Sequence, residues 1–150
     1  MPLHASCAAL QGDGVLILGP PGAGKSDLVL RLIGRGWSLV ADDQVEVEAA
    51  GDALLAAPPA PLRGMLEVRG LGLFRDLPVS VPARLRLVVD LLDVATQPPR
   101  LPEPRAWQAL GQSLPRVALR GDEASAPDKV TFALAAAQGR LATAAGAFAA

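Results

Sequence analysis

The residues best suited to chemistry form one glycine-rich run, Gly19-Pro20-Pro21-Gly22-Ala23-Gly24-Lys25-Ser26. The run matches the pattern G-x-x-x-x-G-K-[ST] at every fixed position. In such a loop, glycines bring the backbone N–H groups close to an anion, and the helix that follows adds its positive N-terminal end. Lys25 is placed to reach the β- and γ-phosphates of a nucleotide, and the Ser26 hydroxyl is placed to bind Mg²⁺. We therefore expect the run to bind a nucleotide or polyphosphate, which leaves the reaction itself open.

The segments on either side of this loop predict the strand and helix that such a loop requires. The preceding run, Val15 to Leu18, is continuously apolar, as is typical of a strand buried on both faces. In the segment from Lys25 to Arg35, apolar residues recur at helical spacing, and Gly34 and Gly36 are expected to end the helix. This context favours a phosphate loop over the alternative, a glycine-rich turn followed by a chance Lys-Ser.

Two adjacent carboxylates, Asp42 and Asp43, follow a predicted strand from Trp37 to Ala41. In an open α/β sheet, ligands bind at the carboxyl ends of the strands, so we expect this pair to face the phosphates held by the loop. One carboxylate would help to bind Mg²⁺, and the other would take a proton from an acceptor hydroxyl. The alternative is that the pair starts a turn and points to solvent.

Three further residues are candidates for the same site. His4, the only histidine, begins an apolar run to Leu10 that is predicted to form a hairpin with the strand before the phosphate loop, because Asp13-Gly14 is a hairpin signal. That hairpin would bring His4 beside Leu18 and Gly19, where it can hydrogen-bond an aspartate; the alternative is a surface residue near the terminus. Glu67 and Arg69 share one face of a predicted strand, as site residues or as an exposed salt-bridged edge.

The remaining pattern predicts a few more elements without obvious chemistry. Ser125 to Asp128 has the form of a capping box that opens an alanine-rich helix, and residues 142–150 are expected to fray. The other segments are predicted strands at Val45–Glu48, Arg84–Asp90 and Leu114–Leu119, a loop at Pro58–Pro61, and an exposed extended segment at Pro98–Pro104.

Composition favours a single cytoplasmic α/β domain over residues 1–150. Apolar residues make up 51% of the chain but aromatics only 3%, so the core must be built from small aliphatic side chains. With 14 basic and 15 acidic residues, the chain lacks the basic excess of a nucleic-acid-binding protein. The lone Cys7 excludes an intrachain disulfide and a cysteine-based zinc site. No apolar stretch has the length of a membrane span, and the N-terminus does not resemble a signal peptide.

The order of these motifs resembles the catalytic domain of HPr kinase/phosphorylase, in the short alphaproteobacterial form without an N-terminal domain. The resemblance runs from His4 to Gly72 and depends most on Val40-Ala41-Asp42-Asp43 and on Leu66-Glu67-Val68-Arg69-Gly70-Leu71-Gly72. It implies a fold related to phosphoenolpyruvate carboxykinase. It also implies ATP- and Mg²⁺-dependent phosphorylation of a serine on the phosphocarrier protein HPr, often with the reverse dephosphorylation. This reaction would serve the regulation of carbon metabolism by the phosphotransferase system. Members of the family are expected to form homo-oligomers.

Carried over by position, the resemblance implies a role for each candidate residue. Lys25 would bind phosphate, and Ser26 and Glu67 would be the Mg²⁺ ligands. Asp43 would accept the proton in the kinase direction and donate it in the reverse direction, with Asp42 beside it and His4 in contact with the aspartate pair. The family's Pro-x-x-Pro-Gly-Arg-Asn loop, which carries a catalytic arginine, is not matched by Leu114 to Gly121, and the choice between Arg116 and Arg120 stays open.

Two other functions stay open at this point. The same loop would serve a small-molecule kinase or NTPase, which would act on a metabolite. It would also serve a non-catalytic nucleotide sensor, which would bind ATP without turning it over.

Overall fold

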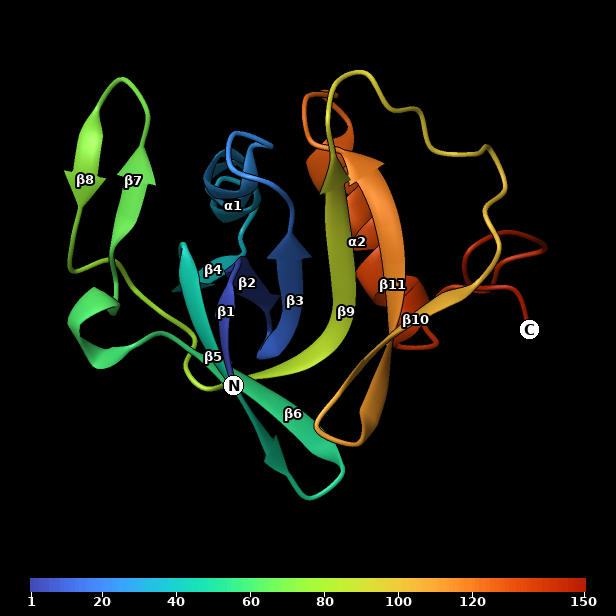
Figure 1. Cartoon of the computed structure of the whole chain (residues 1–150), viewed down its shortest axis with the longest axis horizontal. Coiled ribbons are helices and arrows are strands. Elements are labelled where there is room, and N and C mark those ends of the chain that lie inside the picture. Colours follow the sequence, from blue (N-terminus) through green and yellow to red (C-terminus); the bar gives the residue numbers. More distant parts are fainter.

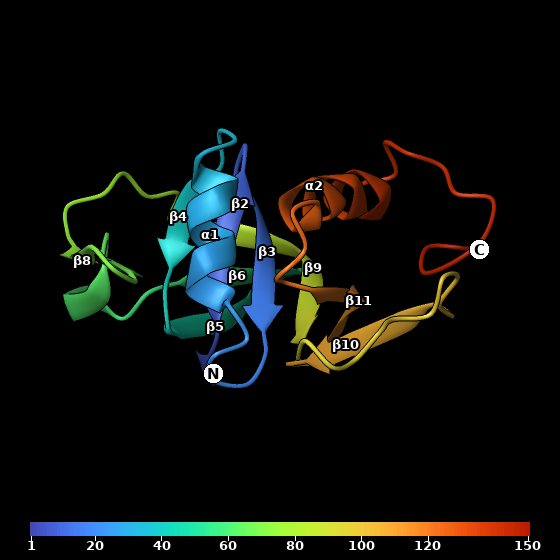
Figure 2. The same ribbon diagram turned by 90° about the horizontal axis from the view of Figure 1, so that it is seen from above.

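The computed structural model describes residues 1–150 and shows two helices on one face of a mixed β-sheet (Figure 1, Figure 2). The α/β class expected from the sequence is therefore confirmed. The elements in chain order are β1 (Pro2–His4), β2 (Ser6–Leu10), β3 (Asp13–Leu18), α1 (Lys25–Ile33), β4 (Ser38–Ala41), β5 (Gln44–Ala50), β6 (Ala53–Ala57), the 3₁₀ turn η1 (Ala60–Leu62), β7 (Leu66–Val68), β8 (Gly72–Phe74), β9 (Ala83–Leu92), β10 (Arg105–Ala109), β11 (Gln112–Arg120) and α2 (Ala126–Ala137).

The direction of the strands brings four strand ends to one edge of the main sheet. Its order is β1-β5-β6-β9-β3-β2-β4, with β11 also paired to β9 and β10 paired to β11. Strands β3, β9 and β11 are parallel to one another. Strand β2 is antiparallel to both β3 and β4, so β4 runs in the same direction as β3. The carboxyl ends of β3, β4, β9 and β11 therefore lie at the same edge, where an open sheet binds its ligands.

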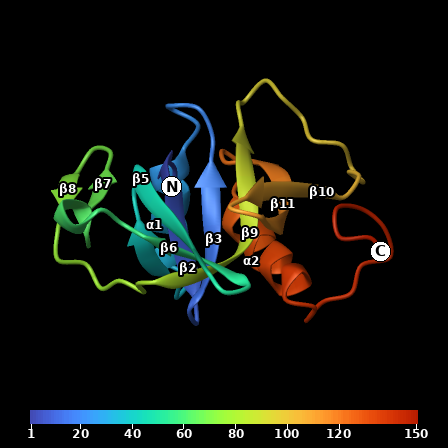
Figure 3. The ribbon, with the colours of Figure 1, turned by 60° about the horizontal axis from the view of Figure 1, so that its bottom comes forward.

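Strand β3 is buried on both faces, as its apolar sequence predicted. Ile17 belongs to the core beneath the helices, with Leu28 and Leu32 of α1 and Val130 of α2. The next side chain back along the strand, Leu16, belongs to a second core on the opposite face. Figure 3 shows that β5 and β6 cross in front of this opposite face while the helices lie behind it. Since both faces are covered, the loop after β3 starts from a firmly held strand end.

The hairpin of β2 and β3 is confirmed, but its turn and its first strand differ from the prediction. The turn is Gln11-Gly12, with φ of 53° and 84°, while Asp13 already belongs to β3. Positive φ at both turn residues is typical of the two-residue hairpin turn that matches strand twist. The predicted first strand is interrupted at Ala5, between β1 and β2, where the Ala5 N–H donates to the Asp43 carbonyl at 3.2 Å.

This break places His4 differently from the prediction. Strand β1 leaves the hairpin and pairs with β5, so that His4 lies opposite Gln44. The expectation that His4 lies beside Leu18 and Gly19 is therefore wrong. The physical reason is that the backbone turns away from β3 at Ala5, which bonds to Asp43, and β1 then pairs with the open edge of β5.

The C-terminal part contains two corrections. Helix α2 begins where it was predicted, but the Ser125 side chain makes no capping hydrogen bond because its backbone is already helical, with φ of −80° and ψ of −1°. The predicted capping box is therefore wrong. Residues 142–150 form no helix or strand, yet Ala147 and Phe148 pack against the core beneath the helices, so this part of the tail is not frayed. Neither helix has the length and apolar character that crossing a membrane would require.

Candidate active site

The glycine-rich loop joins β3 to α1 and has the backbone shape that its sequence predicted. Gly22 and Gly24 have φ of 82° and 97°, a region that other residues rarely adopt. Gly24 precedes α1, and no side chain caps this helix, so its first N–H groups are open to an anion. A side chain at Gly19 would come within 3.1 Å of the Leu91 carbonyl oxygen, so the start of the loop rests directly on β9.

Lys25 folds back over this loop. Its Nζ donates to the carbonyl oxygens of Gly19 at 2.8 Å and of Pro20 at 3.2 Å. These partners are backbone carbonyls rather than carboxylates, so the ammonium charge is held at the loop without an ion pair to neutralise it. An anion bound in the loop would meet this charge.

Asp42 is the buried centre of the polar contacts at the sheet edge, with only 9% of the residue exposed. Its Oδ1 accepts hydrogen bonds from Ser26 Oγ at 2.7 Å and from Ser6 Oγ at 2.9 Å. Its Oδ2 accepts a longer one from the Glu67 N–H at 3.4 Å. Buried carboxylates need such donors because desolvation is otherwise costly. Asp42 therefore ties β2, the start of α1 and β7 to the end of β4.

Asp43 has a different position from its neighbour. The Gln44 N–H donates to the Asp42 carbonyl at 2.8 Å, and Asp43 between them has a φ of 69°. An i→i+2 bond across a residue of positive φ is the rarer, strained form of the γ-turn, and backbone strain of this kind is concentrated at functional sites. The turn leaves Asp43 lining the pocket while Asp42 stays buried. The alternative that both carboxylates point to solvent is therefore wrong.

A pocket of about 490 Å³ lies between the start of α1 and the β7–β8 hairpin, which stands apart from the main sheet (Figure 1). It brings Lys25, Ser26 and Asp43 together with Glu67 and Arg69. The full lining is Ser6, Pro21, Gly22, Gly24, Lys25, Ser26, Asp27, Leu30, Asp43, Glu67, Val68 and Arg69. The pocket does not include His4. Strand β7 ends at Val68, so Arg69 does not share a strand with Glu67, and no ion pair joins the two; the prediction of a salt-bridged strand edge is therefore wrong.

Several lining residues were missed by sequence reasoning. Ser6, Asp27, Leu30 and Val68 line the pocket, and Ser6 is fully buried in it. A signal for Ser6 existed, because it is the only hydroxyl side chain in the otherwise apolar strand β2. A polar side chain on a buried strand needs a partner, and the nearby aspartates supply one.

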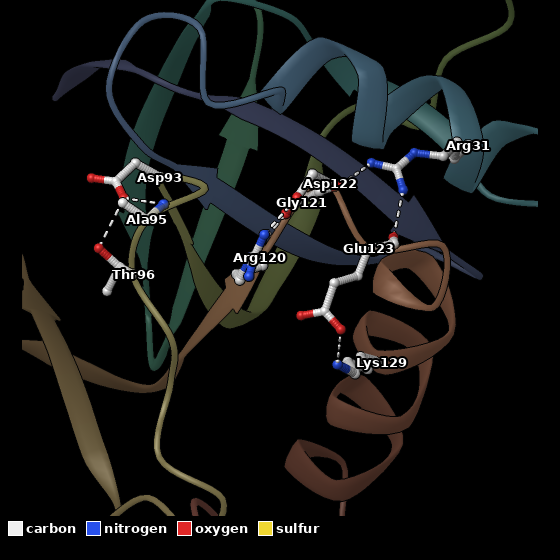
Figure 4. Close-up of polar contacts among 9 residues, drawn as sticks. All are labelled: Arg31, Asp93, Ala95, Thr96, Arg120, Gly121, Asp122, Glu123 and Lys129. Carbon is white, nitrogen blue, oxygen red and sulfur yellow. Dashed lines mark hydrogen bonds and ion pairs between the residues drawn. The ribbon is translucent and has the colours of Figure 1, made fainter.

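The two arginines left open by the sequence have different partners, and neither lines the pocket. Arg116 makes a two-pronged contact to Asp90, with both bonds at 2.8 Å, which joins β11 to β9 and raises the pKa of Arg116. Arg120, at the end of β11, makes a similar contact to Asp122 at 3.1 and 2.7 Å (Figure 4). That hydrogen bond raises the pKa of Arg120 and lowers the pKa of Asp122.

The oxygen atoms in this pocket suit Mg²⁺. No group of three or more His, Cys, Asp or Glu side chains in the chain is arranged to hold a metal by itself. Mg²⁺ rarely needs such a cage, since it usually takes one or two carboxylates and completes its shell with water and substrate phosphates. Ser26 and Glu67 are hydroxyl and carboxylate groups on the same pocket, so the donor set fits this ion.

Fold and site together define the class of this chain: an α/β domain in which a glycine-rich loop and carboxylates meet at one edge of a mixed sheet. Among known families, the model of the HPr Serine kinase C-terminal domain matches residues 1–104. The chain belongs to this family.

Individual relatives agree with this assignment. HPr kinase/phosphorylase from Aromatoleum aromaticum is 44% identical over 116 residues, which cover 71% of this chain and 37% of the relative. The protein of the same name from Stenotrophomonas maltophilia strain K279a is 41% identical over 115 residues, covering 72% and 35%. The chain thus spans about a third of the length of these relatives. The solved structure of the Hpr(Ser) kinase/phosphatase from Coxiella burnetii has a TM-score of 0.75 at 26% identity and covers 88% of this chain and 92% of its own.

Proposed function

We propose that this domain is a protein serine kinase that transfers the γ-phosphoryl group of ATP to a serine of an HPr-type phosphocarrier protein. The observation that carries the proposal is the pocket in which Lys25 and Ser26 of the loop face Asp43 and Glu67. The names of the relatives supply the acceptor. The reverse dephosphorylation of phosphorylated HPr belongs to the same proposal.

In this proposal the run Gly19–Ser26 binds the phosphates of ATP. The backbone N–H groups of the loop and of the first turn of α1 surround the phosphates. Lys25 exchanges its hydrogen bonds to the Gly19 and Pro20 carbonyls for contacts to phosphate oxygens. Ser26 and Glu67 hold Mg²⁺, which neutralises phosphate charge when bound. These assignments use only side chains that line the pocket or the loop.

The two aspartates have different roles in this proposal, one in proton transfer and one in positioning. Asp43 accepts the proton of the acceptor hydroxyl in the kinase direction and returns it in the reverse direction. Asp42 is a positioning residue, because both of its carboxylate oxygens already accept hydrogen bonds from Ser26, Ser6 and the Glu67 backbone. His4, across from Gln44, acts through the Asp43 turn rather than on the substrate, so His4→Ala should slow turnover less than Asp43→Asn.

Three finer points of the proposal depend on the family resemblance. They are a fold related to phosphoenolpyruvate carboxykinase, a cytoplasmic location and a homo-oligomeric state. The mixed sheet supports the first point, since the strand before the loop has an antiparallel neighbour in β2 as well as a parallel one in β9.

The decisive experiment is to incubate the purified chain with γ-labelled ATP, Mg²⁺ and HPr. An acid-stable phosphoserine on HPr is the expected product, and HPr lacking its acceptor serine is the matched control. Labelling of a metabolite in place of HPr would support a small-molecule kinase. Binding of ATP with no turnover of any acceptor would support a nucleotide sensor, and either result would contradict the proposal.

A further inference from the structure

The corner between β11 and α2, residues Arg120 to Glu123, lies directly against the phosphate loop. A Cβ atom at Gly121 would lie 3.1 Å from the Ala23 carbonyl oxygen and 3.2 Å from Leu91 Cδ1. Since few real side chains approach so closely, glycine permits the corner to touch the loop backbone. The contact joins segments about a hundred residues apart, and it forms one wall of the loop.

Arg31 of α1 holds this corner in place (Figure 4). One terminal nitrogen of its guanidinium donates to the Gly121 carbonyl, and the other donates to the Glu123 carbonyl at 3.1 Å. Its Nε lies 3.1 Å from Asp27 Oδ2, and Asp27 lines the pocket. A guanidinium presents donors in a fixed fork, so its two terminal nitrogens can bind two carbonyls at once, whereas a lysine ammonium is a single point charge.

These contacts connect α1, the corner and the phosphate loop to one another. Helix α1 carries Lys25 and Ser26 at its start, and Arg31 follows Lys25 by six residues on the same helix. Arg31 binds the corner, the corner touches Ala23, and Ala23 leads back through Gly24 to Lys25. Figure 4 shows two further contacts of the corner: Arg120 binds Asp122 within it, and Lys129 of α2 binds Glu123 at 3.0 Å. The loop therefore has a firm wall on the side away from the pocket.

We propose that Arg31 is a positioning residue for phosphate binding, and that it acts by fixing Gly121 against the loop. The inference rests on the proposed function, because it takes the loop to be the phosphate site. The N–H groups of the loop bind an anion only if they converge on it, so a wall that fixes Ala23 also fixes the direction of those groups. Arg31 itself does not line the pocket.

The test compares two variants with two matched controls. Arg31→Lys keeps the charge but loses the fork, and Gly121→Ala presses a methyl group onto the loop. The control Arg35→Ala removes the next arginine in the chain, just after α1, whose ion pair with Asp128 at 3.2 Å is exposed and reaches α2 rather than the corner. The control Gly34→Ala adds a methyl group where the nearest atom is 3.4 Å away.

For each protein we would measure Kd for MgATP and for inorganic pyrophosphate by calorimetry, KM and kcat with HPr, and Tm. Both test variants should weaken MgATP and pyrophosphate binding and raise KM for ATP by roughly tenfold to a hundredfold, the scale of a 1 Å misplacement. The KM for HPr should stay unchanged, and both controls should bind like the wild type.

A lower Tm with unchanged Kd values in the folded test variants would overturn the inference, because Arg31 would then only stabilise the fold by joining α1 to the corner. Equal losses in the controls would overturn it as well. The two test variants perturb the wall from opposite sides, so either one decides the matter if the other does not fold. A wild-type chain that binds neither MgATP nor pyrophosphate would contradict the proposed function and the inference together, whereas wild-type binding with unaffected variants would contradict the inference alone.

Discussion

The hydroxyl of Ser26 donates a hydrogen bond of 2.7 Å to the carboxylate of Asp42, across 16 residues of sequence. Ser26 lies in the first turn of α1, and Asp42 directly follows β4. The same carboxylate oxygen accepts the Ser6 hydroxyl at 2.9 Å. Asp42 is therefore occupied within the protein, and Asp43 is the aspartate of the pair that the pocket exposes.

The first prediction separates the roles of these two aspartates. Asp43→Asn keeps the shape of the side chain but removes the proposed base, so nucleotide binding should survive while HPr phosphorylation falls by about 10²–10⁴-fold. Asp42→Asn should instead lower the free energy of unfolding by about 1–3 kcal/mol, since it weakens buried hydrogen bonds. Calorimetry with MgATP, a kinase assay and urea unfolding measure the three quantities. Retained turnover in Asp43→Asn with loss in Asp42→Asn would mean that their roles are exchanged.

The second prediction concerns Lys25, whose ammonium lies over the loop without a carboxylate partner. Lys25→Ala should reduce the kinase rate by about 10²–10³-fold, the scale of losing one preorganised electrostatic contact. Its far-UV circular dichroism and Tm should stay close to wild type, because Lys25 does not belong to either core. Arg100→Ala, which removes an exposed cation elsewhere, is the charge-matched control. Phosphorylation of HPr by Lys25→Ala at the wild-type rate would refute the phosphate-loop assignment.

The third prediction tests Glu67 as a Mg²⁺ ligand. Glu67→Gln keeps the size of the side chain and its backbone N–H contact to Asp42, but it removes the charge that the metal would use. The Mg²⁺ concentration needed for half-maximal activity should rise. Glu48→Gln, on an exposed part of β5, should leave the titration curve unchanged. A Glu67→Gln curve that overlays the wild type would assign Glu67 a structural role only.

The fourth prediction concerns Cys7, the only cysteine, which is completely buried in the core on the face opposite the helices. Burial raises the pKa of its thiol, because the charged thiolate is poorly solvated there. The thiolate is the reactive form, so a thiol reagent at pH 8 should modify Cys7 only when the chain unfolds. The measurement compares labelling rates in buffer and in denaturant. Rapid labelling of the folded protein would show that this core opens readily.

Much of the site could be predicted from the sequence because its parts are local. The buried strand β3, the loop and α1 follow one another in the chain, so apolar spacing and glycine positions within about twenty residues specify all three. The aspartate pair was also placed correctly at the sheet edge, since a strand that follows the loop helix returns in the direction of β3. These features depend on turn chemistry and periodicity, which short windows of sequence contain.

Only the tertiary structure decided which distant segments complete the site. His4 was expected beside the loop, but β1 pairs with β5, because strand pairing depends on which free edge is available rather than on the strand's own residues. Glu67 reaches the pocket on a small hairpin outside the main sheet, and Ser6 reaches Asp42 because β2 lies between β3 and β4. The corner at Gly121 lies against Ala23, far from it in the sequence, in a fold in which α2 packs beside α1. Contacts of this kind are chosen by packing across the whole chain, so no local pattern specifies them.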